Sequence, residues 1–138
     1  MVDSVNSGQR SEKQSGDPGL LGRIVDFLPD GVLALDHEGK AVVWNRAAEE
    51  MTGVMKEEVL GRGEYAYAVP FYGERRPILV DILLGNGKEW KRGYEKVERK
   101  GQILVGEGFA PYAYGGRGLH FWTLAAPIYD EKGNLLGA

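Results

Sequence analysis

The sequence lacks cysteine, and its 138 residues contain only two histidines, His37 and His120. Without cysteine the chain can form no disulfide framework, no thiolate zinc site and no iron–sulfur cluster, and it has no cysteine nucleophile. Two histidines are too few for an all-histidine metal site. We therefore expect no metal centre and no cysteine-based reaction.

Long apolar runs are also missing, since no window reaches the roughly 18 apolar residues of a membrane span. Residues 1–16 carry few apolar side chains and no apolar segment of the kind that a secretory signal needs. They cannot bury enough surface to offset their ordering entropy, so we expect a disordered tail. With neither a signal nor a span, we expect a cytoplasmic protein without membrane contact.

Charge of one sign is not concentrated either. The net charge is −3 and the isoelectric point is about 5.4. Nucleic-acid-binding domains are normally basic, so we expect no nucleic-acid partner.

Glycine, in contrast, is abundant. The chain has 21 glycines, about twice the ordinary share of roughly 7%. Seven of them fall at predicted element boundaries: Gly31, Gly39, Gly53, Gly61, Gly85, Gly101 and Gly133. The surplus therefore indicates one domain built from many short elements.

The domain is expected over residues 17–138, with a helix at about 17–28 and a core at about 29–138. Asp17-Pro18 is a typical helix start, because Asp caps the first turn and Pro suits the first helical position. Two β-rich runs, 32–35 and 40–44, flank a turn that has Asp first and Gly last. This pattern predicts a hairpin.

Short elements follow to the end of the sequence. We predict helices at 46–52, 56–60 and 78–84, and strands at 94–99, 103–109 and 119–128. A second Asp-x-x-Gly turn, 130–133, leads into a last strand that we expect to be truncated. The order has no βαβ alternation, so it predicts an α+β fold with an antiparallel sheet and helices on one face.

Four segments in this order resemble the PAS domain, a sensory module of signal-transduction proteins. They are 28–32 (LPDGV), 36–40 (DHEGK), 44–53 (WNRAAEEMTG) and 126–134 (APIYDEKGN). The resemblance covers about residues 20–138, and segment 65–99 departs from the compact family pattern. It implies a PAS-like five-stranded antiparallel sheet with short helices on one face and an N-terminal flanking helix. It also implies a sensor in a two-component system, with an effector domain such as a histidine kinase in the parent chain.

The resemblance implies several ligand classes, and the residues exclude some of them. The flavin photoreceptors and the photoactive-yellow-protein type both need a cysteine, which is absent. The haem type usually uses a histidine before the third strand, and residues 54–100 contain none. We expect no cofactor. Two possibilities remain for the interior: it binds a small organic metabolite, or it is fully packed and binds no ligand.

The resemblance implies a ligand pocket between sheet and helices, for which the candidate lining residues are Trp44, Met51, Val54, Leu60, Ile78, Ile82, Leu104, Phe109, Tyr112, Trp122 and Leu124. Arg75 and Arg76 are candidate polar anchors, because a pair of arginines could clamp a carboxylate. Strand 119–128 has two possible faces. Either His120, Trp122 and Leu124 point inward or Leu119, Phe121 and Thr123 do, and a one-residue shift exchanges them.

Three functions compete at this stage. The first is a ligand-binding sensor that forms a homodimer through an apolar stripe of Leu20, Leu21, Ile24, Val25 and Leu28. The second is a ligand-free dimerisation module whose aromatic side chains fill the core. The third is a small enzyme based on Asp36, His37 and Glu38, which is disfavoured because solvent leaves such groups in a turn unperturbed. We therefore expect no catalytic residue.

Overall fold

The computed structural model describes residues 18–85 and 94–138. The expected tail, residues 1–16, lies outside the described residues. The chain divides into two units, and the boundary between them in the sequence lies between Asp30 and Gly31. The described part of the first unit contains helix α1 (Pro18–Phe27), in agreement with the predicted helix at about 17–28.

The second unit begins with an antiparallel hairpin of β1 (Leu33–Leu35) and β2 (Ala41–Trp44). Asp36 closes its turn, because one carboxylate oxygen accepts hydrogen bonds from the backbone N–H groups of Glu38 and Lys40 at 2.9 and 3.0 Å. Gly39 has φ of +81°, a conformation that favours glycine. The predicted hairpin is confirmed.

Short helices follow in the middle of the chain; those near 46–52, 56–60 and 78–84 were predicted, whereas those within 66–72 were not. They are α2 (Arg46–Thr52), the 3₁₀ turns η1 (Lys56–Glu58) and η2 (Ala66–Ala68), α3 (Val69–Tyr72) and α4 (Leu79–Leu83). Asn45 caps α2, since its side-chain oxygen accepts from the N–H of Ala48 at 3.0 Å. Gly53 ends α2 in the left-handed conformation.

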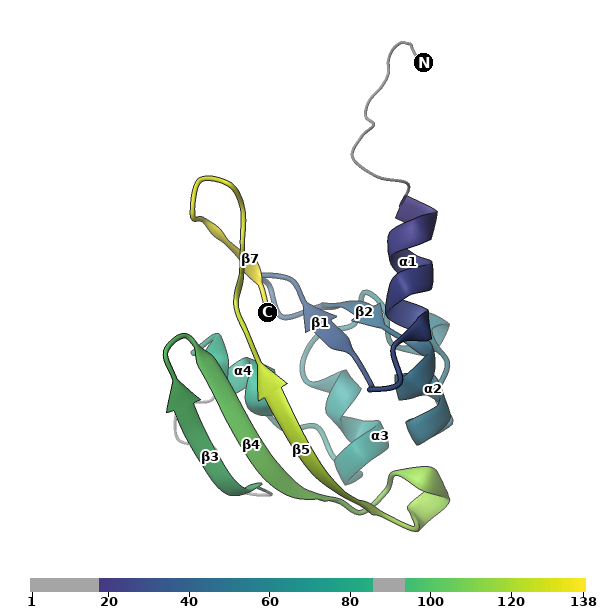
Figure 1. Ribbon diagram of the computed structural model, residues 1–138. Coiled ribbons are helices and arrows are strands. Elements are labelled where there is room, and N and C mark those ends of the chain that lie inside the picture. Colours follow the sequence, from purple (N-terminus) through teal and green to yellow (C-terminus); the bar gives the residue numbers. More distant parts are fainter. Residues whose placement is uncertain (1–17, 86–93) are drawn as a thin grey trace. The chain divides into compact units, whose positions relative to one another are not determined.

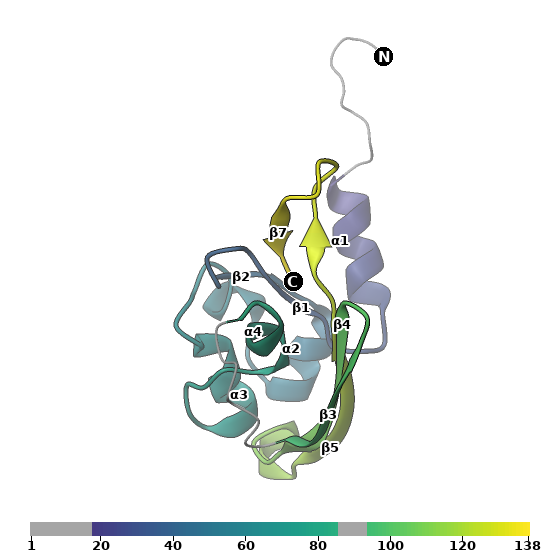
Figure 2. The same cartoon turned by 90° about the vertical axis from the view of Figure 1, so that its left-hand side faces the viewer.

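Three antiparallel strands form the main sheet, in the order β3 (Tyr94–Lys100), β4 (Ile103–Ala110) and β5 (Leu119–Ala125). The 3₁₀ turn η3 (Tyr114–Gly116) lies in the connection from β4 to β5. The register pairs Gly106 with Thr123 and Gly108 with Phe121. Figures 1 and 2 show the helices α2, α3 and α4 on one side of this sheet.

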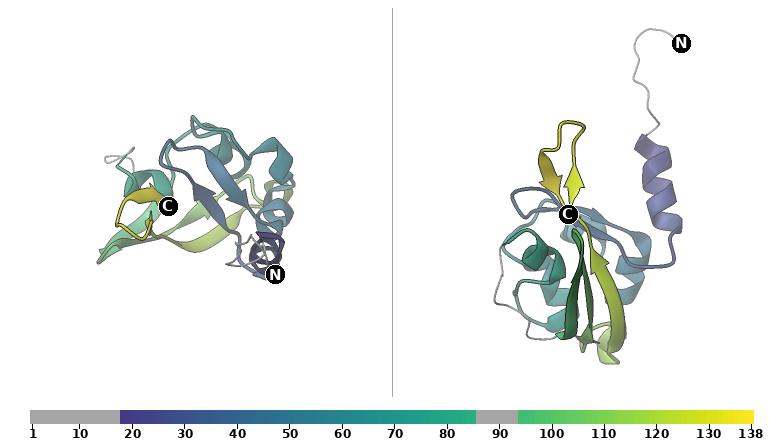
Figure 3. Two further views of the ribbon diagram at one scale, coloured as in Figure 1. Left: turned by 90° about the horizontal axis from the view of Figure 1, so that it is seen from above. Right: turned by 60° about the vertical axis from the view of Figure 1, so that its left-hand side comes forward.

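The predicted strand 119–128 is split in two. β5 ends before Ala126 and Pro127, and β6 (Ile128–Tyr129) pairs with β7 (Leu135–Gly137) in a second hairpin (Figure 3). Proline has no N–H to donate to a ladder, which explains the interruption. The end of this hairpin joins β1, because the backbone of Ala138 exchanges hydrogen bonds of 2.8 and 3.0 Å with that of Leu35.

The α+β architecture with antiparallel strands is therefore confirmed, with the strands arranged as three hydrogen-bonded groups. The core lies between these strands and the helices, and its largest members include Leu35, Trp44, Tyr67, Leu79 and Leu104. Among the described residues, no helix is both long enough and apolar enough to cross a membrane.

Candidate functional site between helices and sheet

Six of the predicted lining residues lie in the interior or at its edge. Trp44, Ile78 and Leu104 are buried, and Met51, Val54 and Ile82 are half-buried. Trp44 is held from two sides. Its indole N–H donates to the carbonyl of Val54 at 3.0 Å, and its ring lies 5.8 Å from that of Phe71.

The other five predicted lining residues are exposed, which corrects their assignment to an interior pocket: Leu60, Phe109, Tyr112, Trp122 and Leu124. The exposed fractions of Trp122 and Leu124 are 65% and 52%. In the register of β4 and β5, His120, Trp122 and Leu124 share the face that points away from the helices, whereas Phe121 and Thr123 point inward. Phe109 pairs with His120 and so lies on the same outer face.

Leu60 and Tyr112 are exposed for local reasons. Leu60 lies between Val59, which caps the end of η1, and Gly61, so it lies in a surface turn. Tyr112 lies after β4, and its ring covers Gly73, where an added Cβ would approach the ring to 2.5 Å.

A carboxyl group is buried in the same interior. Asp81 of α4 is 1% exposed, and Tyr67 of η2 donates its hydroxyl to one carboxylate oxygen at 2.6 Å. The backbone N–H of Ile78 donates to the other oxygen at 2.9 Å. Burial raises the pKa of Asp81 above its usual value, although both hydrogen bonds oppose the shift.

Two further tyrosines extend this polar group towards β3. The hydroxyl of Tyr94 accepts from the backbone N–H of Leu79 at 2.8 Å and is also hydrogen-bonded to Tyr72. Burial raises the pKa of both Tyr72 and Tyr94. Both phenols therefore stay neutral in the physiological range, as polar groups inside an apolar environment.

Sequence reasoning missed Tyr67, Asp81, Tyr72 and Tyr94 as interior polar groups. One signal was available, because Asp81 interrupts the apolar run Ile78–Leu84 at the centre of a predicted helix. A carboxyl group there is rarely buried without partners. The tyrosines come from segments far away in the sequence, and no local pattern joins them to Asp81.

The match to a family model decides the classification. The model described as "PAS fold" matches residues 19–138. The chain belongs to the PAS family. A comparison with curated proteins gives no match. Among solved structures, the PAS domain of BvgS from Bordetella pertussis is similar with a TM-score of 0.53. The identity is 18%, over 86% of this chain and 76% of that chain, so this likeness concerns the fold.

The two predicted anchors of this PAS domain do not act as a pair. Arg76 is 5% exposed, and its guanidinium carbon lies 4.2 Å from the centre of the Tyr72 ring, in a cation–π arrangement. Arg75 is exposed and donates to the carbonyl of Glu64 at 3.0 Å. Because one arginine is buried and the other is at the surface, they do not form the expected clamp.

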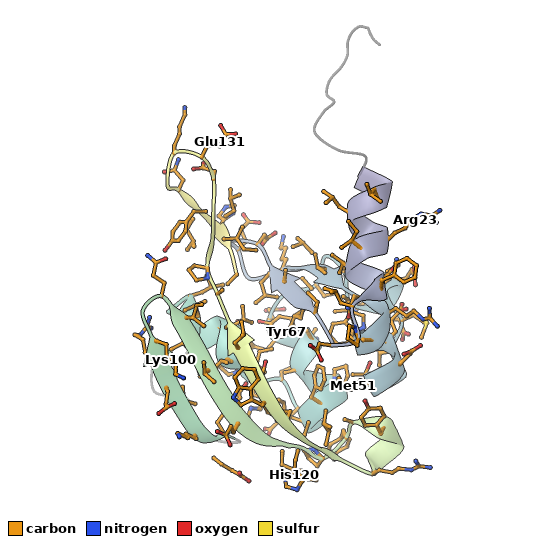
Figure 4. All side chains as sticks on the ribbon, in the orientation of Figure 1. Arg23, Met51, Tyr67, Lys100, His120 and Glu131 are labelled. Carbon is orange, nitrogen blue, oxygen red and sulfur yellow. The ribbon has the colours of Figure 1, made fainter. Side chains whose placement is uncertain are left out.

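The acidic turn considered for catalysis lies at the surface of the PAS domain. The carboxylate of Asp36 accepts two backbone hydrogen bonds, and the one from Lys40 does most to lower its pKa. Figure 4 labels Tyr67, whose hydroxyl donates to Asp81, among the side chains beside the helices. Among the residues that the structure describes, no group of three or more His, Cys, Asp and Glu could hold a metal ion.

Proposed function

We propose that this PAS sensory domain relays a signal within a larger cytoplasmic signalling protein, such as a histidine kinase, by binding a small organic ligand in its interior. The observation that carries this proposal is the mixed interior. Tyr67 of η2, Asp81 of α4 and Tyr94 of β3 are polar groups held among apolar side chains, the first two bonded to each other and the third to the backbone of Leu79. Ligand sites are mostly apolar with a few polar groups that fix orientation.

Dimerisation is the second part of the proposal. The apolar side chains Leu20, Leu21, Ile24, Val25 and Leu28 follow one another at helical spacing, and the first four lie in α1. An amphipathic helix of this kind is suited to pairing with a second copy. In a homodimer, the interface between the two copies is a second surface. Ligand binding can act through this interface to change the position of an attached effector.

A ligand-free dimerisation module is the alternative, and the aromatic packing favours it. The rings of Trp44 and Phe71 lie 5.8 Å apart, and those of Tyr94 and Phe121 lie 5.9 Å apart in an edge-to-face arrangement. Such contacts fill interior space that a ligand would need. A stand-alone enzyme has less support, because the Asp36 turn is open to solvent.

Recovery of a ligand from the purified protein distinguishes the ligand-binding sensor from the ligand-free module. The full 138-residue chain is examined by native mass spectrometry, then denatured and extracted for metabolite profiling. The sensor proposal expects a stoichiometric small molecule that is released on unfolding. No such molecule, together with no thermal shift in a metabolite panel, would favour the ligand-free alternative.

Two variants then localise any ligand that is found. Tyr94→Phe removes an interior hydroxyl, and Tyr112→Phe removes an exposed one. We expect the first variant to weaken binding by about fivefold to tenfold, the effect of one lost hydrogen bond of roughly 1 kcal/mol. The Tyr112→Phe control should bind as the unchanged protein does. Equal affinities for all three proteins would place the ligand elsewhere.

A further inference from the structure

The connection between β4 and β5, residues 111–118, lies over the end of helix α3, and we call it the strap. The backbone N–H of Tyr112 donates to the carbonyl of Phe71 at 3.1 Å. The ring of Tyr112 covers Gly73, the residue that ends α3. Ala113 is fully buried, and the 3₁₀ turn η3 of the strap lies beside α2 (Figure 1). The strap therefore covers α2 and α3 at this end of the domain.

Few hydrogen bonds tie the strap to the rest of the domain. Gly116 and Gly118 donate their backbone N–H groups to a carbonyl within the strap itself, at 3.2 and 2.9 Å. In the described part of the chain, the bond from Tyr112 to Phe71 is the only hydrogen bond that joins the strap to an element other than β4. A segment with so few ties can open while the rest of the domain stays folded.

The backbone dihedral angles give the strap a hinge. Tyr114 has φ of +54°, in the left-handed region that residues with a side chain rarely adopt. Gly115, Gly116 and Gly118 also have positive φ, of +66°, +93° and +85°. Glycine moves between left-handed and right-handed conformations at little cost, and hinges are a few loop residues that absorb such changes. The closed strap therefore strains Tyr114, and the glycines beside it allow that strain to be released.

The residue that holds the strap belongs to the aromatic interior. The ring of Phe71 lies 5.8 Å from that of Trp44 and 6.4 Å from that of Tyr72. Trp44 is 2% exposed. Tyr72 is hydrogen-bonded to Tyr94, one of the polar groups of the proposed ligand site. The bond from Tyr112 to Phe71 thus connects the strap directly to the interior in which a ligand is proposed to bind.

We propose that the strap is a gate to this interior. In the closed state Tyr112 rests on Gly73 and its amide is bonded to Phe71. In the open state the strap rotates about residues 114–118, and solvent reaches Phe71 and Trp44. The inference rests on the ligand binding under the proposed function and adds the route by which a ligand enters. Opening of such lids commonly sets the rate at which a bound molecule is exchanged.

Gly73→Ala and Gly53→Ala form a matched pair that tests the closed state. Each glycine ends a helix in the left-handed conformation, with φ of +76° and +74°, and donates its N–H to a carbonyl of that helix. The added methyl group collides with the ring of Tyr112 at Gly73 and meets no atom within 4 Å at Gly53. We expect hydrogen exchange of the strap, measured by mass spectrometry, to become about tenfold faster in Gly73→Ala, as for one overpacked contact. Gly53→Ala should leave this exchange unchanged.

Quenching of Trp44 fluorescence by acrylamide tests access to the interior. Trp90→Phe/Trp122→Phe leaves Trp44 as the one tryptophan of the chain. In this background we expect Gly73→Ala to raise the quenching constant by about threefold, because a larger open population exposes Trp44, and its matched control to leave the constant unchanged. Tyr112→Ala removes the ring that holds the strap and should act as Gly73→Ala does. Circular dichroism and urea unfolding check that all variants fold.

The outcomes separate the gate from ligand binding itself. Equal exchange in the two glycine variants, or no effect of Tyr112→Ala, would overturn the closure of the strap by Tyr112. Faster exchange of the strap without greater quenching of Trp44 would mean that the strap opens without exposing the interior, and would overturn the gate. Faster exchange with greater quenching would support the gate even if extraction recovers no ligand, a result that would contradict the ligand-binding sensor alone.

Discussion

At the scale of single residues, Asp81 shows how this interior tolerates a carboxyl group. Each of its oxygens has a donor, from Tyr67 at 2.6 Å and from Ile78 at 2.9 Å. A buried polar group without a hydrogen-bond partner carries its full desolvation cost. Losing one of these donors therefore costs more than the net stabilisation that its hydrogen bond adds. The pair also joins η2 to α4 across the core.

Tyr67→Phe should therefore destabilise the domain by about 1–3 kcal/mol, because it leaves a carboxylate oxygen of Asp81 buried without its hydroxyl donor. Urea unfolding, followed by fluorescence or circular dichroism, measures the change. Tyr114→Phe is the matched control, since Tyr114 is exposed and its change should stay within about 0.5 kcal/mol. Equal effects in the two variants would mean that the bond to Asp81 contributes nothing to stability.

At the scale of elements, Asn45 connects the first hairpin to the first helix of the core. Its side-chain oxygen accepts from the N–H of Ala48 at 3.0 Å and from the N–H of Val32 at 2.8 Å. One side chain thus caps α2 and fixes the approach to β1. Asn45 is 1% exposed, so water cannot replace these bonds.

Asn45→Ala should cost about 2 kcal/mol or more, because helix caps alone contribute roughly 0.5–2 kcal/mol and the Val32 bond is lost as well. The comparison is Glu50→Ala on the exposed side of the same helix, which removes an i, i+4 ion pair with Arg46. That loss should be about 0.3–0.5 kcal/mol. Chemical unfolding of both variants provides the measurement, and a loss for Asn45→Ala no larger than that for Glu50→Ala would contradict the connecting role.

The same scale shows what the sequence could predict. Turn and cap chemistry is local, so the hairpin around Asp36, helix 46–52 and the turn at Asp130 were predicted with nearly correct bounds. Which side chains of strand 119–125 point inward could not be predicted, because both alternating sets are apolar. Gly106 of β4 faces the interior, where an added Cβ would lie 3.2 Å from the ring of Tyr94 and 3.4 Å from Leu79, a relation between elements that periodicity alone does not contain.

At the scale of the whole molecule, the α+β class and the PAS resemblance could be predicted, because the order of the short elements can be read from the sequence. The interior polar groups could not be predicted, since Tyr67 reaches Asp81, and Tyr94 reaches Leu79, only after the chain has folded. The interior position of Trp44 and Leu104 agrees with the sequence, whereas Trp122 faces outward, and a role of the interior residues in ligand binding stays a prediction.

The pH dependence of stability is a property of the whole molecule. The carboxyl groups in the turns and the buried carboxyl group contribute to it in opposite directions. Turn amides, chiefly those of Lys40 and Asn134, lower the pKa of Asp36 and Asp130 below 3.8. Their contribution is present above about pH 4 and is lost as the pH falls through the folded-state value. Burial raises the pKa of Asp81, so its contribution is full below about pH 4 and is lost as the pH rises through its folded-state value.

Asp130→Asn and Asp81→Asn should consequently show opposite pH profiles in urea unfolding, each measured against the unchanged protein. The deficit of Asp130→Asn should be largest near neutral pH and shrink in acid, where the carboxylate that accepts the turn bonds is lost. The deficit of Asp81→Asn should be largest in acid and shrink as the pH rises, because the unchanged protein then loses the advantage of a neutral carboxylic acid. A deficit of Asp81→Asn that grows with pH would instead mean that its two donors outweigh burial and stabilise the ionised form.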